Sequence, residues 1–145
     1  MNMAMRNNFA KAYSNTAVES AVSEASPHKL VELLYDGALK NLNLGKIFIQ
    51  QKNYEKKAEH LNKALSIIAA LQAGIDLEKG KDAAENFANL YRYCYEQTFK
   101  ASSKNDASLI DEVIELIKPI AEAWKAMPDN IKRVSKEQLD RIGTI

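Results

Sequence analysis

Residues 25–39 read Ala-Ser-Pro-His-Lys-Leu-Val-Glu-Leu-Leu-Tyr-Asp-Gly-Ala-Leu, and this stretch determines the type of fold that we expect. Ser26 is a good helix cap, and Pro27 suits the first helical position because its φ is fixed and it has no N–H to leave unpaired. The sequence therefore predicts an amphipathic helix from about Pro27 to Gln50. Its apolar face is marked by Leu30, Leu34, Leu42 and Ile49.

The same period continues along the chain and predicts three further helices. Asn53 is the expected cap of the second helix, in which apolar positions alternate three and four apart until Gly80 ends or interrupts it. Asp82 is the expected cap of the third helix, and a polar stretch at 102–106 separates it from the fourth. Inside the fourth helix Pro119 removes one intrahelical hydrogen bond, so we expect a kink or a loosened turn there. Because short connections favour antiparallel neighbours, the predicted fold is all-α, an antiparallel up-down four-helix bundle.

The two ends of the chain have weaker patterns. Residues 1–25 are rich in Asn, Ser and Ala, and they predict a mobile N-terminal segment that is helical or extended. Residues 26–127 contain the predicted bundle. In the tail at 128–145, the stretch Ser135-Lys136-Glu137-Gln138 has the spacing of a capping box, so we expect one short extra helix there.

Composition narrows the class of protein. The 145 residues are 46% hydrophobic and 27% charged, which is typical of a single soluble globular domain. The formal charge is only +1 and no basic face is visible, so we expect no nucleic-acid partner. No apolar run is long enough to span a bilayer or to form a signal peptide, which predicts no membrane insertion and a cytoplasmic location. Cys94 is the only cysteine, which fits a reducing compartment.

A search for catalytic patterns predicts neither an enzyme nor a cofactor or metal. The Glu-x-x-His pairs of di-iron bundles, the His-Glu-x-x-His zinc motif and a phosphate-binding glycine loop are all absent. Cys94 falls on the core-facing side of its helix, which predicts an inert thiol. His60, Lys63 and Ala64 match the outline of a histidine phosphotransfer domain, although that family usually has Gly at the last position. A phosphotransfer protein that uses His60 and a structural helical adaptor are the alternative hypotheses.

The opening stretch also resembles that of the flagellin-specific secretion chaperones, the FliS family, which carry a similar Ala-Ser-Pro-x-Lys-Leu and then Leu-Tyr-Asp-Gly-Ala-Leu. The resemblance extends from about Phe9 to Met127. The chain differs from the family at Gly80-Lys81-Asp82, where Gly-Gly-Glu is common, and in the tail after Met127. The residues that carry the family motif are Ser26, Pro27, Lys29, Leu30, Tyr35, Asp36 and Gly37.

The resemblance implies a cytosolic flagellar export chaperone. Such a protein holds the C-terminal segment of flagellin, its client, along apolar grooves, which prevents premature polymerisation and keeps the subunit competent for type III secretion. The client segment is disordered before it binds, so a large apolar contact must offset the entropy of ordering it. The flagellar export gate is a further candidate partner, and the expected state is a monomer or a weak homodimer.

We expect the client to contact a groove on the second, third and fourth helices. Each candidate residue also has a structural interpretation, in core packing or as a solvated polar group. Phe9 and Tyr13 are candidates for a plug that covers the groove, or else they cover the end of the bundle, and for Gly37 we expect internal packing. The candidate client-binding residues are Ala64, Ile68, Leu71, Asn86, Leu90, Tyr91 and Tyr95.

Overall fold

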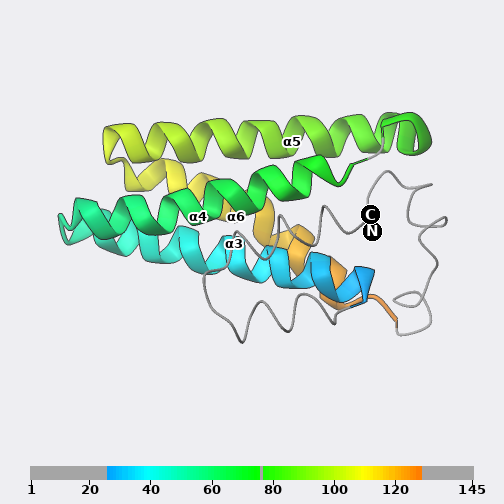
Figure 1. The fold of residues 1–145 in the computed structure, drawn as a ribbon, viewed down its shortest axis with the longest axis horizontal. Helices are drawn as coiled ribbons and strands as arrows, with labels where there is room; N and C mark the ends of the chain where they lie inside the picture. The colour runs from blue at the N-terminus through cyan, green and yellow to red at the C-terminus, as the bar shows by residue number, and fades with distance from the viewer. Residues whose placement is uncertain (1–25, 76, 129–145) are drawn as a thin grey trace.

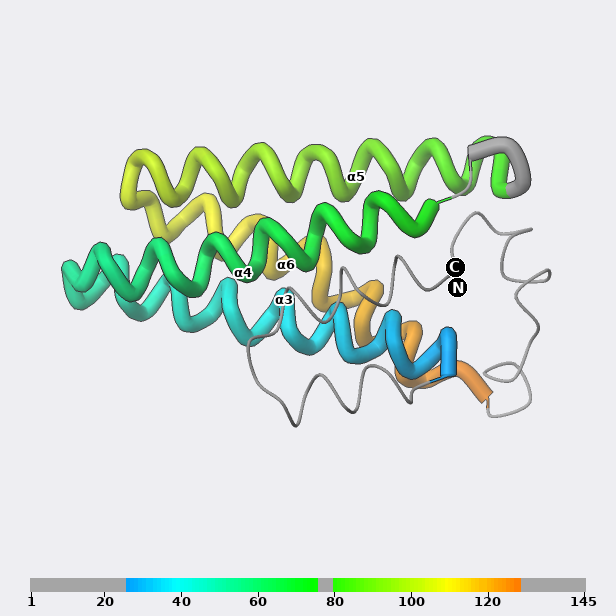
Figure 2. Tube along the Cα trace, in the orientation of Figure 1, coloured from blue at the N-terminus to red at the C-terminus, as the bar shows by residue number. Residues whose placement is uncertain are grey.

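The computed structural model describes residues 26–75 and 77–128, with the backbone alone at 77–79. These residues form four helices, α3 (Pro27–Gln50), α4 (Tyr54–Ala73), α5 (Leu77–Lys104) and α6 (Ala107–Lys125). Consecutive helices run in opposite directions, and α6 packs back against α3 (Figures 1 and 2). The prediction of an all-α, up-down four-helix bundle is confirmed.

Three short polar side chains begin three of the helices. Ser26 Oγ accepts a hydrogen bond from the Lys29 N–H at 3.2 Å, and Pro27 follows at the first helical position, as the sequence predicts. Asn53 caps α4 in the same way, by accepting from the Lys56 N–H. Asp106 caps α6. Each cap accepts a hydrogen bond from a backbone N–H that has no partner inside its helix. Such a capping hydrogen bond stabilises the protein by about 1 kcal/mol.

The predicted end of the second helix at Gly80 is wrong. Helix α4 ends at Ala73 and is capped by Gly74, whose N–H bonds back to the carbonyl of Ala70. Gly80 lies inside the first turns of α5, where the backbone leaves the helical conformation at Lys81, with φ 49° and ψ −126°. This break comes directly before Asp82, the residue expected to cap the third helix. The second helix is shorter than predicted because apolar spacing alone does not reveal that Gly74 ends it.

Helix α6 continues through Pro119, which is solvent-exposed. The kink predicted there stays a prediction. The division of the chain into 1–25, 26–127 and 128–145 also stays a prediction, because its first segment and all of the tail except Pro128 lie outside the described residues. Among the helices that the structure describes, none is both long enough and apolar enough to cross a membrane.

Side chains from all four helices form one continuous core. Its largest fully buried members are Leu30, Leu34, Leu42, Leu61, Ile67, Ile68, Ile110 and Ile117. Helices α3 and α4 approach each other closely at Gly45, where an added Cβ would lie 2.2 Å from Leu61 Cδ2 and 2.6 Å from Leu61 Cγ. Gly45 is therefore required for the two helices to pack at this distance.

The contact at Gly45 generates a stability prediction. Gly45→Ala should destabilise the bundle by about 1–3 kcal/mol, because the new methyl group overpacks against Leu61, a fully buried side chain. Urea unfolding measures the change. In a Leu61→Ala background the same substitution should be much less harmful, because the space that it needs is then open. Equal effects of Gly45→Ala in the two backgrounds would contradict this account.

Candidate functional site

His28 and Trp124 join the first turn of α3 to the last turn of α6. The Trp124 indole N–H donates to the His28 carbonyl at 2.9 Å, and His28 Nε2 donates to the Trp124 carbonyl at 3.0 Å. The two rings stack with their centroids 4.6 Å apart, and both residues are buried. These paired bonds satisfy polar groups that would otherwise be costly to bury. They hold α3 and α6 together.

A buried pair of tyrosines continues this cluster into α5. The hydroxyls of Tyr35 and Tyr91 lie 2.6 Å apart, and the Tyr35 ring meets the edge of Trp124. Burial raises the pKa of Tyr35, partly offset by its hydrogen bond with Tyr91. Burial, assisted by the neighbouring Tyr35, raises the pKa of Tyr91 as well. Both hydroxyls are therefore neutral at physiological pH and act as a structural link between α3 and α5.

The other residues of the opening motif also have structural contacts. Leu30 is in the core, and Lys29 pairs with Glu32 one turn on. Asp36 forms an ion pair with Lys125 of α6 at 2.6 Å, and this hydrogen-bonded pairing raises the pKa of Lys125. Gly37 is buried, and its carbonyl accepts from the Asn41 side chain. The motif thus begins α3 and attaches it to its neighbours.

The seven candidate client-binding residues fall into three separate places. Four of them are buried in the core, namely Ala64, Ile68, Leu71 and Tyr91. A client contacts these four only if the helices move apart, so their role in binding stays a prediction. Asn86 is exposed and Leu90 half-buried, and by helical phase both lie on the side of α5 that faces α6. Tyr95 is exposed on the opposite side of α5, toward α4. Phe9 and Tyr13 lie outside the described residues.

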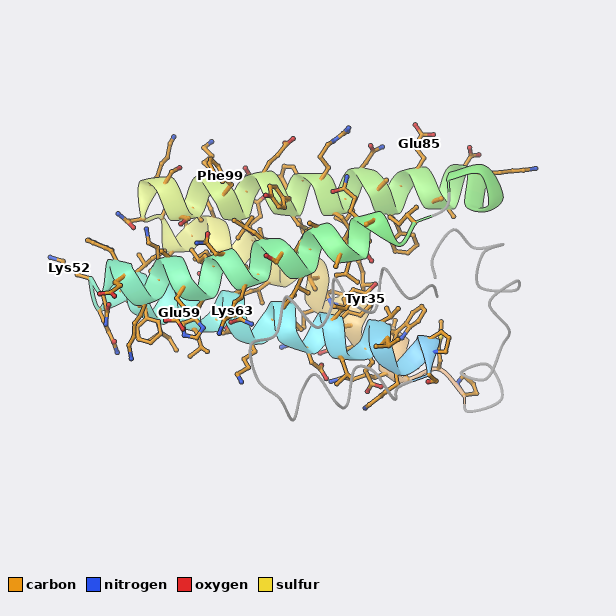
Figure 3. All side chains as sticks on the ribbon, viewed as in Figure 1. Tyr35, Lys52, Glu59, Lys63, Glu85 and Phe99 are labelled. Atoms are coloured by element: carbon orange, nitrogen blue, oxygen red, sulfur yellow. The ribbon has the colours of Figure 1, made fainter. Side chains whose placement is uncertain are left out.

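The side of α5 toward α4 carries the most exposed apolar side chain of the described bundle. This residue is Phe99 (Figure 3), which is 60% exposed, and Tyr95, one turn before it, is 37% exposed. A cavity of about 510 Å³ lies farther along the same two helices, near the break at Lys81. It is lined by Gln72, Lys81, Asp82, Glu85, Ala88, Asn89 and Arg92. The residues proposed from the sequence did not include Phe99 or Arg92. The spacing of Arg92, Tyr95 and Phe99, three and four residues apart, places them on one side of a helix and could have indicated them.

On its other side, α5 is attached to α6 by polar contacts. The Tyr93 hydroxyl donates to a carboxylate oxygen of Glu112, and the Gln97 amide donates to the other oxygen. The bond to Glu112 raises the pKa of Tyr93. Glu112 is therefore already engaged within the bundle.

His60 has a structural environment on α4. The side-chain amide nitrogen of Asn41 donates to the Gly37 carbonyl at 2.8 Å. The amide oxygen of Asn41 therefore faces His60 and accepts a hydrogen bond from His60 Nδ1 at 3.0 Å. The imidazole also stacks on Phe48. Burial lowers the pKa of His60, so the neutral ring is favoured near pH 7. These contacts connect α3 and α4 and give no indication of phosphoryl transfer.

No group of three or more His, Cys, Asp and Glu residues in the described part of the chain is arranged to hold a metal ion. Cys94 is buried, and burial raises the pKa of its thiol to about 11. A thiol with so high a pKa is almost fully protonated at neutral pH and is a poor nucleophile.

Comparison with known proteins gives a consistent result. The family model for flagellar protein FliS matches residues 9–131. The chain is 47% identical over 116 residues to a flagellar secretion chaperone of Salmonella typhimurium, which covers 79% of this chain and 86% of that one. The corresponding protein of Vibrio cholerae is 42% identical over 118 residues, covering 81% and 87% of the two chains. The Bacillus subtilis protein is 30% identical over 126 residues, covering 87% and 89%.

The tyrosine pair generates a second stability prediction. Tyr35→Phe should destabilise the protein by about 1–3 kcal/mol, because it leaves the buried Tyr91 hydroxyl without its partner. Replacing both tyrosines by Phe should cost less than the single change, since no polar group is then left unpaired. Urea unfolding of the two single variants and the double variant measures this. A double variant whose loss equals the sum of the two single losses would contradict the pairing.

The same pair predicts a loss of stability at alkaline pH. In the unfolded chain both hydroxyls ionise near pH 10, whereas the raised pKa values keep them neutral in the fold. Their contribution is thus complete below pH 10 and is lost as pH rises above it. Over pH 9 to 11, the wild-type urea midpoint should fall more steeply than that of the Tyr35→Phe/Tyr91→Phe variant. Parallel profiles would contradict the prediction.

Proposed function

The chain belongs to the FliS family of flagellar secretion chaperones, and we propose that its client is the C-terminal segment of flagellin. By covering that segment, the protein prevents premature polymerisation and keeps the subunit competent for type III secretion. Binding takes place in the cytoplasm and involves no catalysis. The flagellar export gate is a further proposed partner, and the free protein is a monomer or a weak homodimer.

The exposure of Phe99 beside Tyr95 is the observation that best supports client binding. A large apolar side chain that is 60% exposed contributes little to the stability of the bundle, because most of its surface stays in water. It is available to a partner instead. A disordered segment that folds on binding needs apolar area of this kind to offset its ordering entropy.

The compact core supports binding on the outside of the bundle. Ile68 and Ala64 are fully buried, and the hydrogen bond between Tyr35 and Tyr91 connects α3 to α5. Opening the bundle to expose these groups would sacrifice core burial worth several kcal/mol. We therefore propose that the client contacts the exposed α5 residues while the core stays closed. Phe9 and Tyr13 remain candidates for a cover over the site.

Calorimetric titration with a peptide from the C-terminal end of flagellin of the same organism tests this function. Binding should be accompanied by a clearly negative heat-capacity change, because apolar surface is buried as the peptide folds. Circular dichroism of the mixture should show more helix than the sum of the separate components.

A scrambled peptide of the same composition is the control. Absence of binding at high micromolar concentration, both for the full chain and after removal of residues 1–25, would contradict the proposed function. Acid-labile phosphate on His60 that is lost in His60→Gln would then support the phosphotransfer alternative. Self-association without either activity would support the structural adaptor.

A further inference from the structure

We propose that the outer surface between α4 and α5 receives one helix of the client, that Arg92 pairs with a carboxylate of that helix, and that Tyr95 and Phe99 contact its apolar side chains. The inference rests on the proposed function and adds to it the site and a recognition rule. We call this surface the α4–α5 face. Its residues are Ala58, Asn62, Leu65, Ala69 and Gln72 of α4, and Ala88, Arg92, Tyr95 and Phe99 of α5.

The spacing of these residues suits a third helix. Along α4 they are four, three, four and three apart, and along α5 they are four, three and four apart. This is the spacing at which helices pack side by side at shallow angles, with side chains of one fitting between side chains of the next. In the bundle core the same spacing packs the bundle's own helices against one another. On the α4–α5 face, by contrast, eight of the nine residues are exposed or half-buried, and only Leu65 is buried.

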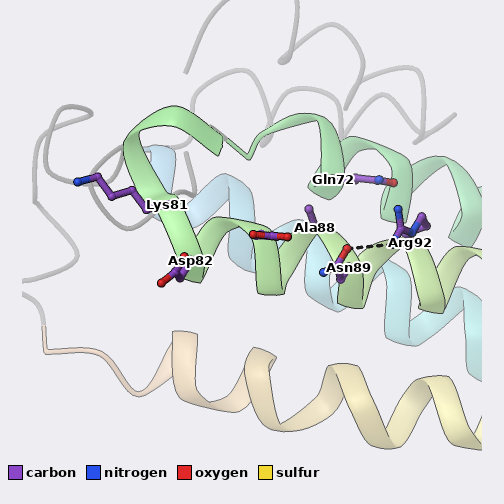
Figure 4. A pocket seen from close by; sticks show the side chains of 7 residues that line it. Gln72, Lys81, Asp82, Ala88, Asn89 and Arg92 are labelled. Atoms are coloured by element: carbon purple, nitrogen blue, oxygen red, sulfur yellow. Dashed lines mark hydrogen bonds between the residues drawn. The ribbon is translucent and has the colours of Figure 1, made fainter.

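The register of the two helices is fixed at both ends of the face. Near Phe99, the Lys57 ammonium group donates to the Ser102 carbonyl at 2.9 Å. At the other end, Gln72 of α4 lines one cavity together with Ala88 and Arg92 of α5 (Figure 4). Ala58 therefore lies near Phe99, and Ala69 lies near Arg92. At a rise of 1.5 Å per residue the face is about 21 Å long, which is about four helical turns.

Side-chain size divides the face into two parts. At one end, Ala69 and Ala88 have small side chains, so the backbone of an incoming helix can approach α4 and α5 closely. At the other end, Tyr95 and Phe99 project and give large apolar contacts. Arg92 lies between these parts, one turn from Tyr95. A helix on this face therefore meets a cation beside an apolar contact region.

Arg92 is the strongest indication of the partner's chemistry. Its guanidinium donates to the Asn89 amide oxygen at 2.9 Å and makes no ion pair with any carboxylate of the described residues (Figure 4). Lys100 and Lys118 also make no ion pair with a described residue, so what distinguishes Arg92 is its place on the α4–α5 face, one turn from Tyr95. A guanidinium binds a carboxylate through two parallel hydrogen bonds, with more geometric specificity than a lysine provides.

These observations give a recognition rule for the client. The bound helix carries Asp or Glu opposite Arg92, with apolar residues three or four and seven positions away, opposite Tyr95 and Phe99. The other side of α5 does not offer the same combination. Its exposed aromatic residue, Tyr93, already donates to Glu112, and Gln97 donates to the same carboxylate.

Two single variants, each with a matched control variant, test the proposal with the full chain and the C-terminal flagellin peptide. Arg92→Glu should weaken binding at least tenfold, whereas Lys100→Glu, the same charge change at an exposed position elsewhere on α5, should change it less than threefold. Phe99→Ala should also weaken binding at least tenfold. Tyr93→Ala removes an aromatic ring that is 41% exposed on the other side of α5, and it should leave binding within threefold.

A charge swap identifies the contact directly. Each acidic residue of the peptide is replaced in turn by Lys, and one replacement should weaken binding to the wild type and restore binding to Arg92→Glu. Thermal unfolding of each variant establishes that the bundle is intact. Wild-type binding to Arg92→Glu and Phe99→Ala, or equal losses in Arg92→Glu and Lys100→Glu, would overturn this inference and leave the proposed function standing. No binding by the wild-type chain would instead overturn the proposed function itself.

Discussion

The bundle depends on the contact between His28 of α3 and Trp124 of α6, which joins two residues that lie 96 positions apart in the chain. Hairpin turns bring α3 to α4 and α5 to α6, but no short connection holds α6 against α3. Two side chain-to-backbone hydrogen bonds and a stacked ring pair do so at this point. Through the edge of Trp124 the contact continues to Tyr35, and from there to Tyr91 of α5.

This closure supports the proposal that the client binds on the outside of the bundle. In the closed bundle, α5 has three sides that differ in their contacts. Its buried side contributes Tyr91 and Cys94 to the core, and the side toward α6 is attached through Glu112. The side toward α4 carries Phe99 and also Arg92, which makes no ion pair with any residue that the structure describes. A chaperone needs such a surface, because the surface must stay available until an unfolded partner arrives and must not disrupt the fold meanwhile.

Much of the fold could be predicted from the sequence, whereas much of the candidate site could not. The caps at Ser26 and Asn53 are local signals, so the starts of α3 and α4 were predicted correctly. Apolar residues three and four positions apart, however, occur both in a bundle core and on a surface that binds a further helix. Ile68 therefore looked like part of a groove and is fully buried, while Phe99 was missed. His28 was also missed as a core residue, because its hydrogen-bond partner comes from the far end of the chain.

Trp124 gives the most direct test of the claim that the client binds outside a closed core. It is the only tryptophan, it is 6% exposed, and it lies in the contact that closes the bundle. Its fluorescence is followed while a flagellin peptide without tryptophan is added to saturation. If the core stays closed, the emission maximum and the low quenching by acrylamide should remain unchanged while calorimetry records binding. A red shift with increased quenching at saturation would show that the client opens the bundle and would contradict this account.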